Sequence, residues 1–274
     1  MSAPPGAVER RVARWRDGAL DERADRIAEE VPVAFAYNGE PFAVMMATPS
    51  DLADFALGFS LTEGVIAHAE ELADIGVAQR LEGWEIALTI PPSRARALAS
   101  RERTLEGRSG CGVCGSKRLD DLVRVPAPVA AEPRVSASAL DAALVAMAAR
   151  QSLAAATGAT HAAAWAGADG DIAFVREDVG RHNALDKLIG AIARANVDRD
   201  AGFAIVTSRA SYELAMKAAG AGIGLLAAVS APTALAISLA DSANLTLIGF
   251  ARPGGCAVYT HHRRYAGAPQ GGNP

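Results

Sequence analysis

Short apolar runs alternate with helix-like segments between residues 160 and 260, and this alternation constrains the fold more than any other feature. The predicted strands span residues 172–175, 203–206, 225–229, 245–248 and 257–260. Amphipathic or small-residue segments separate them, including one with Leu185, Leu188 and Ile192 on one helical face. Such alternation predicts an α/β domain of three layers, α/β/α, with mainly parallel strands.

The chain before this region has a different pattern. Asn38-Gly39 separates two apolar runs and predicts a hairpin, since both residues tolerate positive φ. Residues 48–51 are expected to open a helix, and residues 84–90 alternate as a strand. A small N-terminal α+β domain follows from this pattern. A long alanine-rich helix is expected to begin at Ser136 or Ser138 and to run towards Gly158.

These patterns divide the chain into four parts. Residues 1–28, rich in arginine and acidic residues, are expected to be a tail or a loosely attached arm, with regular structure starting near Val31. Residues 29–125 form the α+β domain, which ends in a loop containing two cysteines. Residues 126–264 form the α/β domain after a Pro-Ala-Pro linker, and residues 265–274 are a second tail.

Composition excludes several classes of protein. The formal net charge of -4 argues against general nucleic-acid binding. Residues 218–240 contain no charged side chain, but their glycines and Pro232 divide them into a strand and a helix, so no membrane span is expected. The first residues lack the apolar core of a signal peptide. A cytoplasmic protein is expected.

Cys111 and Cys114 lie two residues apart in a glycine-rich, basic segment. Positive charge favours the thiolate, which is the nucleophilic form, so the pair is a candidate for catalysis. Three other interpretations compete with this one. A structural zinc site would need two more ligands, and the chain offers only Cys256 and five scattered histidines. A structural disulfide would constrain little chain, and a thioredoxin-like redox pair would need a helix that the glycines interrupt.

Three predicted strand ends carry polar loops, at residues 207–211, 230–233 and 249–255. Ligands of α/β sheets bind where strands end and helices begin. Hydroxyl groups, guanidinium groups and free backbone N–H groups at such an edge are suited to hold a phosphate-bearing ligand. The candidate binding residues are Arg209, Ser211, Ser230, Thr233, Phe250, Ala251, Arg252, Pro253, Gly254 and Gly255. Helix capping is the alternative role for Ser211 and Ser230.

The densest polar run is residues 176–187, between a predicted strand and a predicted helix. It is either a solvated turn capped by Asn183 or a charged network along the same sheet edge, in which His182 is a candidate proton donor or ligand contact. Nearby, His161 and Ala163 stand where a zinc-dependent deaminase has His-x-Glu. The missing Glu, and a cysteine pair that precedes the histidine, make a working deaminase improbable.

Together these motifs resemble the FdhD family of formate dehydrogenase accessory sulfurtransferases. The resemblance covers about residues 31–260 and rests on the following motifs: Asn38-Gly39, Thr48-Pro49-x-Asp51, Gly58-Phe59, Glu63-Gly64, Cys111-Gly112-Val113-Cys114, Thr157-Gly158-x-x-His161-Ala162, the run 176–187, Ser208-Arg209-Ala210-Ser211-x-Glu213 and Ser230-Ala231-Pro232-Thr233.

The resemblance implies a sulfur carrier. A cysteine desulfurase would load persulfide sulfur onto Cys111, with Cys114 as its helper. The sulfur would then pass to the molybdenum (or tungsten) bis-guanine-dinucleotide cofactor of formate dehydrogenase, bound as a substrate, with GDP as a mimic of one fragment. The resemblance also implies a homodimer and a second domain similar to the cytidine deaminase fold without zinc. A binding chaperone without catalysis and a thiol-disulfide redox protein are the alternatives, and Cys256 departs from the family pattern.

Overall fold

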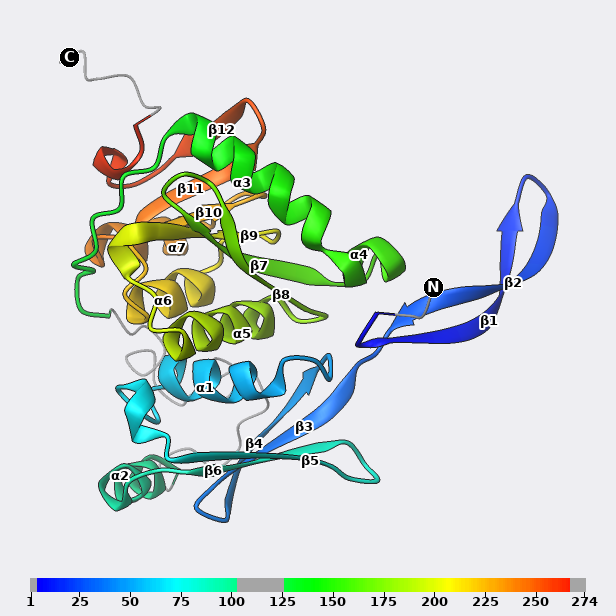
Figure 1. Cartoon of the computed structure of the whole chain (residues 1–274), viewed down its shortest axis with the longest axis horizontal. Coiled ribbons are helices and arrows are strands. Elements are labelled where there is room, and N and C mark those ends of the chain that lie inside the picture. Colours follow the sequence, from blue (N-terminus) through cyan, green and yellow to red (C-terminus); the bar gives the residue numbers. More distant parts are fainter. Residues whose placement is uncertain (1–3, 103–125, 267–274) are drawn as a thin grey trace.

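A six-stranded mixed sheet lies at the centre of the larger part of the molecule (Figure 1). The computed structural model describes residues 4–102 and 126–266. The strand order is β12-β11-β10-β9-β7-β8, and the strands are β7 (His161–Gly167), β8 (Ile172–Asp178), β9 (Gly202–Val206), β10 (Leu225–Ala228), β11 (Thr246–Arg252) and β12 (Gly255–Val258).

The prediction of a mainly parallel sheet is wrong. Only the pairs β9–β10 and β10–β11 are parallel, whereas β7–β8, β7–β9 and β11–β12 are antiparallel. The physical reason is the length of the connections. Short turns join β7 to β8 and β11 to β12, and a short turn can connect only antiparallel neighbours. The sequence pattern also missed β7, whose buried residues are mostly alanine.

Helices cover both faces of this sheet, so the three predicted layers are present (Figure 1). On one face, α3 (Ala137–Arg150) packs through residues such as Leu140 against Ile205 and other strand side chains. On the other face lie α5 (Arg181–Arg194), α6 (Tyr212–Gly220) and α7 (Ala234–Ser242). Their apolar side chains, including Leu188, form a second core with Leu226.

The alanine-rich segment before β7 forms two helices, not the single helix expected from sequence. Ser136 caps α3, as predicted, by accepting a hydrogen bond from Ala139 N at 3.1 Å. The helix ends at Gln151, whose ψ of 72° is not helical, and α4 (Ser152–Thr157) follows. The Glu177 carboxylate accepts hydrogen bonds from the first amides of α4, and this side-chain cap starts a new helix in a new direction.

A four-stranded sheet forms the first region, in the order β4-β3-β6-β5. Its strands are β3 (Val31–Tyr37), β4 (Glu40–Ala47), β5 (Asp74–Gln79) and β6 (Trp84–Thr89), and its helices are α1 (Leu52–Thr62), α2 (Pro92–Glu102) and the short η1 (Ala69–Glu71). The predicted hairpin at Asn38-Gly39 is confirmed, with φ of 52° and 87° at the two turn residues. Phe35 and Phe55 pack edge to face in the core between sheet and α1.

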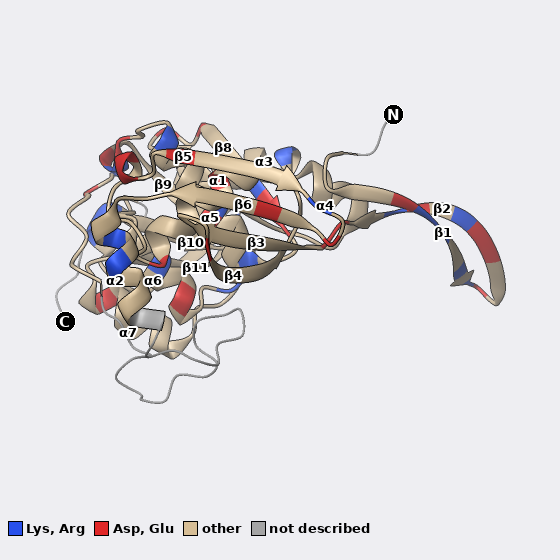
Figure 2. Cartoon of the chain, turned by 90° about the horizontal axis from the view of Figure 1, so that it is seen from below, with Lys and Arg blue, Asp and Glu red and all other residues tan. Residues whose placement is uncertain are grey.

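Of the two expectations for the N-terminal residues, a tail or a loosely attached arm, the described residues fit the arm, but their regular structure starts at Ala7 and not near Val31. β1 (Ala7–Arg16) and β2 (Ala19–Ala28) pair over their whole length as an antiparallel hairpin, here called the arm. Asp17 and Gly18 form its turn, with φ of 52° and 82°. Positive φ at both positions is typical of a two-residue type I′ turn, whose twist matches that of the flanking strands. Asp-Gly is a strong sequence signal for this turn. The arm projects from the body of the molecule (Figures 1 and 2).

The two regions join through α1, which packs across α5, so that α1 lies between the small sheet and the helices of the large one (Figure 1). At the other end of the chain the fold continues past the expected boundary at residue 264. Tyr265 forms a bridge with Val135, and Ala266 N donates to Val135 O at 2.8 Å. Within the described residues, no helix is long and apolar enough to cross a membrane.

Candidate functional site

The three polar loops predicted from sequence meet at one edge of the six-stranded sheet, where the parallel strands β9 and β10 end. Thr233 N donates to Ala210 O at 3.0 Å, which joins the first loop to the second. Phe250 N donates to Ser230 O at 3.1 Å, which joins the second loop to the third. We call this surface the loop edge. Its residues therefore come together as expected.

The third loop differs in form from the expectation. It is not a glycine turn after a strand but the bulged end of β11, which continues to Arg252 and turns into β12 at Pro253-Gly254. Gly249 packs so tightly that a Cβ there would lie 2.6 Å from Cδ of Pro232. The bulge gives Phe250 a φ of 52° and leaves this residue 52% exposed at the loop edge.

The hydroxyl groups at the loop edge have separate roles. Ser211 and Thr233 are helix N-caps: Ser211 Oγ accepts from Leu214 N at 3.5 Å, and Thr233 Oγ1 accepts from Ala236 N at 3.3 Å. Capping is thus confirmed for Ser211 but not for Ser230, which precedes the cap of α7. The hydroxyl groups of the two caps are used within the fold.

Two exposed arginines remain at the loop edge. Arg209 follows β9, and Arg252 ends β11, where its Nη1 donates to the carbonyl oxygens of Val229 and Ala251. In the part of the chain that the structure describes, neither guanidinium group forms an ion pair. Both groups can therefore contact an anionic ligand from solvent.

The N-terminus of α5 adds titratable side chains to the same edge. His182 Nε2 lies 2.6 Å from Glu213 Oε2 on α6, and this contact holds the pKa of Glu213 below its usual range. Burial, with the charges of Arg181 and His182, lowers the pKa of His161 at the start of β7. Among the described residues, the buried Nε of Arg181 has no hydrogen-bond partner. A buried donor without a partner costs free energy unless a ligand binds it.

Most of the polar run 176–187 is neither a solvated turn nor a lining of the loop edge. Three of its residues, Asp178, Asn183 and Lys187, form a buried network between the first region and the second region, which contains the six-stranded sheet. Lys187 Nζ lies 2.7 Å from Asp178 Oδ2, and both side chains are fully buried. Asp178 accepts from Thr48 N, and Lys187 donates to Thr48 O. Asn183, expected as a cap, donates to Met46 O at 2.8 Å instead.

Two further ion pairs extend this network between α1 and the second region. Arg176 contacts Asp54 of α1 at 2.6 Å, and Lys217 of α6 contacts Glu63, the residue after α1, at 3.0 Å. Thr62, at the end of α1, donates to Asp186 at 2.7 Å. The run is therefore highly polar because its side chains contact polar groups of α1. The local sequence pattern does not reveal these contacts.

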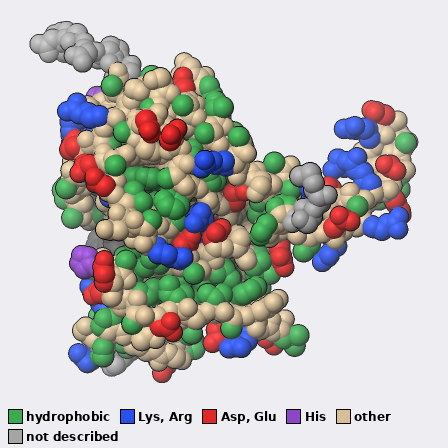
Figure 3. Space-filling view, viewed as in Figure 1, with side chains coloured by type: hydrophobic (Ala, Val, Ile, Leu, Met, Phe, Trp, Pro, Cys, Tyr) green, Lys and Arg blue, Asp and Glu red, His purple; other side chains and the backbone are tan. Residues whose placement is uncertain are grey.

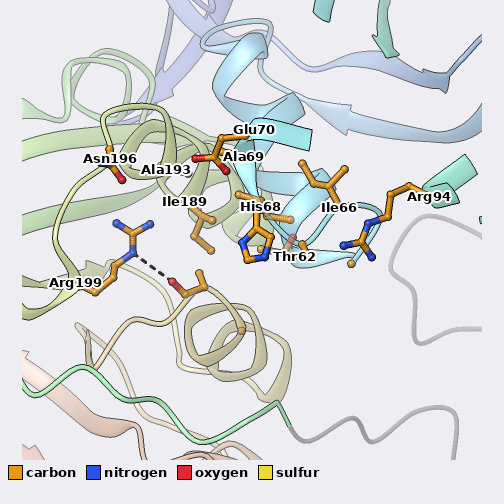
Figure 4. A pocket seen from close by; sticks show the side chains of 15 residues that line it. Thr62, Ile66, His68, Ala69, Glu70, Arg94, Ile189, Ala193, Asn196 and Arg199 are labelled. Carbon is orange, nitrogen blue, oxygen red and sulfur yellow. Dashed lines mark hydrogen bonds between the residues drawn. The ribbon is translucent and has the colours of Figure 1, made fainter. Parts of the chain in front are cut away.

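A cavity of about 550 Å³ lies at the opposite end of α5 from the loop edge. Figure 4 shows His68, Glu70 and Arg94 of the first region facing Asn196 and Arg199 of the second across this space. Since α5 has 14 residues, the cavity lies about 20 Å from the loop edge. Its lining residues come from separate segments, of which only Gly64 belongs to a motif named above, so no local sequence pattern predicts the cavity.

The two cysteines predicted to be catalytic, Cys111 and Cys114, lie outside the described residues. The flanking chain is described on both sides. Arg94 of α2, before them, lines the cavity, and Val129, after them, donates to Ala243 O at the end of α7. The flank after the cysteines therefore attaches at the end of the six-stranded sheet opposite the loop edge, whereas α2 packs in the core of the first region through Leu98.

The third cysteine, Cys256, is half-buried on β12. Burial and a hydrogen bond with Cys256 raise the pKa of Tyr265. Among the described residues, no three histidine, cysteine or acidic side chains are grouped closely enough to hold a metal ion.

The layered mixed sheet, with two exposed arginines at the loop edge, defines an α/β protein of three layers with polar loops at its strand ends. The FdhD/NarQ family model matches residues 28–266, and the chain belongs to this family. The match begins at the last residue of the arm.

Named relatives agree with this assignment. The chain is 61% identical to the sulfur carrier protein FdhD of Xanthomonas euvesicatoria pv. vesicatoria over 96% of this chain and 94% of that protein. It is 51% identical to the sulfur carrier protein FdhD of Cupriavidus necator over 95% of this chain and 91% of that one. A crystal structure described as a formate dehydrogenase accessory protein from Desulfotalea psychrophila matches with a TM-score of 0.76 and 25% identity, over 95% of this chain and all of that one.

Proposed function

We propose that this protein carries sulfur from a cysteine desulfurase to the molybdenum (or tungsten) bis-guanine-dinucleotide cofactor. Formate dehydrogenase would require the cofactor in this sulfur-bearing form for its activity. The observation that carries the proposal is the near-complete match to relatives named sulfur carrier protein FdhD, at up to 61% identity. The sequence also supplies the thiol pair that such a carrier needs, at Cys111 and Cys114.

The thiol chemistry balances within this pair. The Cys111 thiolate attacks the terminal sulfur of the desulfurase persulfide, forms a Cys111 persulfide and releases the desulfurase thiolate. The Cys114 thiolate then attacks the inner sulfur of that persulfide, which forms a Cys111–Cys114 disulfide and releases hydrosulfide to the metal. A dithiol reductant restores the two thiols for the next cycle.

The loop edge is the proposed site for the guanine-dinucleotide part of the cofactor. Arg252 can form paired hydrogen bonds with a pyrophosphate, and Arg209 adds charge beside it. The partnerless Nε of Arg181, at the start of α5, offers a donor to an oxyanion. The exposed ring of Phe250 can stack on a purine. Together these groups support an anionic nucleotide as the ligand of the loop edge.

We further propose that the protein works as a homodimer, which would allow two copies of the loop edge to hold the two nucleotide ends of one cofactor. GDP, as one such end, is the fragment to use in binding measurements. The proposed partners are the cysteine desulfurase and formate dehydrogenase.

Transfer of labelled sulfur tests the proposal directly. The protein is incubated with a cysteine desulfurase and ³⁵S-cysteine, and Cys111→Ala and Cys114→Ala are compared with the parent. We expect label on the parent, none on Cys111→Ala, and retained label on Cys114→Ala. Equal label on Cys111→Ala and the parent overturns the assignment of Cys111, and absence of label from all three chains overturns sulfur transfer.

A double variant separates the carrier from a binding chaperone. Cys111→Ala combined with Cys114→Ala is expected to bind GDP like the parent but to leave formate dehydrogenase inactive in cells that lack the native protein. Full activity with the double variant would show that cofactor binding alone is sufficient. A Cys256→Ala variant serves as the control, because it removes a thiol that lies outside the CxxC pair.

A further inference from the structure

The arm lacks the packing that a hairpin of its size needs. At its base, Glu29 N donates to Gly6 O at 2.7 Å, and a Cβ on Gly6 would lie 2.5 Å from the Thr48 side chain, so this end is fixed to the body. Beyond the base, the hairpin stands away from the rest of the described chain (Figures 1 and 2). A two-stranded hairpin alone is marginally stable in water. The arm is therefore expected to have a partner.

The tip of the arm presents a pair of large apolar side chains. Trp15 and Leu20 are cross-strand neighbours on one face, and they are 69% and 65% exposed. Towards the base, the same face continues with Ala13 opposite Glu22 and then Arg11 opposite Ala24. Aromatic and aliphatic anchors of this kind dominate the binding energy of protein interfaces when they are buried. The tip is suited to insert into an apolar surface.

The charges of the arm identify the kind of partner. The arm carries six arginines and five acidic residues, so it is nearly neutral as a whole. On the face that carries the two anchors, Glu9 lies opposite Arg26, and Arg11 forms an ion pair with Glu22 at 3.8 Å. Figure 3 shows positively and negatively charged side chains interspersed along the arm. A polyanion such as nucleic acid would meet both signs. A surface of alternating sign is instead complementary to another copy of itself.

We propose that the arm binds a second copy of this chain, with Trp15 and Leu20 as the anchors. This inference specifies a surface of the homodimer proposed above. Strands of ten residues give one face of the arm an area of about 330 Å². In a two-fold dimer each copy gives one arm and receives one, so the two contacts bury about 1,300 Å² in total, which is the size of a specific interface.

The mass of the full chain in solution tests this proposal. We expect light scattering after size exclusion to give a dimer for the parent and a monomer for Trp15→Ser combined with Leu20→Ser. Losing both anchors of one arm is expected to weaken its contact at least about thirtyfold, so the two arms together raise the dimer dissociation constant at least about a thousandfold. Leu81→Ser is the matched control, because Leu81 is 97% exposed in the body and should leave the dimer intact.

Hydrogen exchange gives a second, independent measurement. The amides of Ala7–Ala28 should be protected at protein concentrations above the dimer dissociation constant and should exchange freely below it. A monomeric parent, a dimer that survives the double substitution, or arm protection independent of concentration would each overturn the proposal. The transfer of labelled sulfur to Cys111 is the separate readout for the proposed function, and the arm variants are expected to retain it.

Discussion

Gly58 of α1 and Gly190 of α5 face each other where the two helices cross. A Cβ on Gly58 would lie 1.7 Å from the carbonyl oxygen of Asp186, and a Cβ on Gly190 would lie 1.9 Å from that of Asp54. Neither distance is possible for real atoms, so each helix lies directly against the backbone of the other. This contact sets the distance between the two regions of the molecule.

Alanine at either position is expected to destabilise the protein. The new methyl group meets backbone, which cannot move aside like a flexible side chain, so Gly58→Ala or Gly190→Ala should lower the free energy of unfolding by about 3 kcal/mol. Urea denaturation followed by circular dichroism measures this change. Gly220→Ala, on α6 with no atom within 4 Å of the added methyl group, is the control and should be neutral or slightly stabilising.

Replacing Lys187 by Met is expected to cost about 3–5 kcal/mol of folding free energy, because the buried Asp178 then lacks its positive partner. Arg80→Met removes an exposed ion pair with Glu85 and should cost less than about 1 kcal/mol. Thermal unfolding of both variants checks the difference. Equal effects would contradict the assigned role of the Asp178–Lys187 pair.

Arg252→Ala is expected to weaken GDP binding by about ten- to a hundredfold, which corresponds to a lost charge-assisted contact of about 1.5–3 kcal/mol. Isothermal titration calorimetry with GDP measures the affinity. Because Arg252 also donates to the Val229 carbonyl group, the stability of the variant is measured in parallel, and Arg80→Ala is the control for loss of charge. Unchanged affinity would place the nucleotide elsewhere.

The folded protein should lose stability as the pH falls below about 6.5, in part because of His161. Its pKa in the fold is lowered from 6.5 by burial and by neighbouring positive charge. The unfolded chain therefore binds a proton near pH 6.5 that the folded chain does not yet bind, and the free energy of unfolding decreases. Replacing His161 by Gln removes this contribution, so urea denaturation at pH 7 and pH 5 should show a smaller loss than in the parent. An equal or larger loss would contradict the prediction.

Local signals predicted much of the fold. The hairpin at Asn38-Gly39, the caps at Ser136 and Ser211, and the three layers of the second region all follow from residues close together in sequence. The arm carries an equally strong signal at Asp17-Gly18. Its highly charged strands nevertheless predict a tail or a loosely attached arm without regular structure, because neither face shows the apolar alternation of a half-buried strand.

Long-range contacts account for the rest. The role of residues 176–187 depends on Thr48 and Asp54, more than a hundred residues away. The turn of direction at Gln151 depends on the Glu177 carboxylate. The sequence pattern correctly predicted that three loops meet at the loop edge. The bulge that exposes Phe250 could not be predicted in this way, because it depends on how Gly249 packs on Pro232.

The Thr48 backbone has a consequence for how this chain can be divided. Its amide and carbonyl groups both bond to side chains of the second region, Asp178 and Lys187. A fragment starting at residue 126 would therefore leave a buried carboxylate and ammonium without two of their backbone partners, and it would uncover the α1 side of α5. Such a fragment should not fold by itself. The whole chain should unfold in a single cooperative transition, with the calorimetric and van't Hoff enthalpies equal.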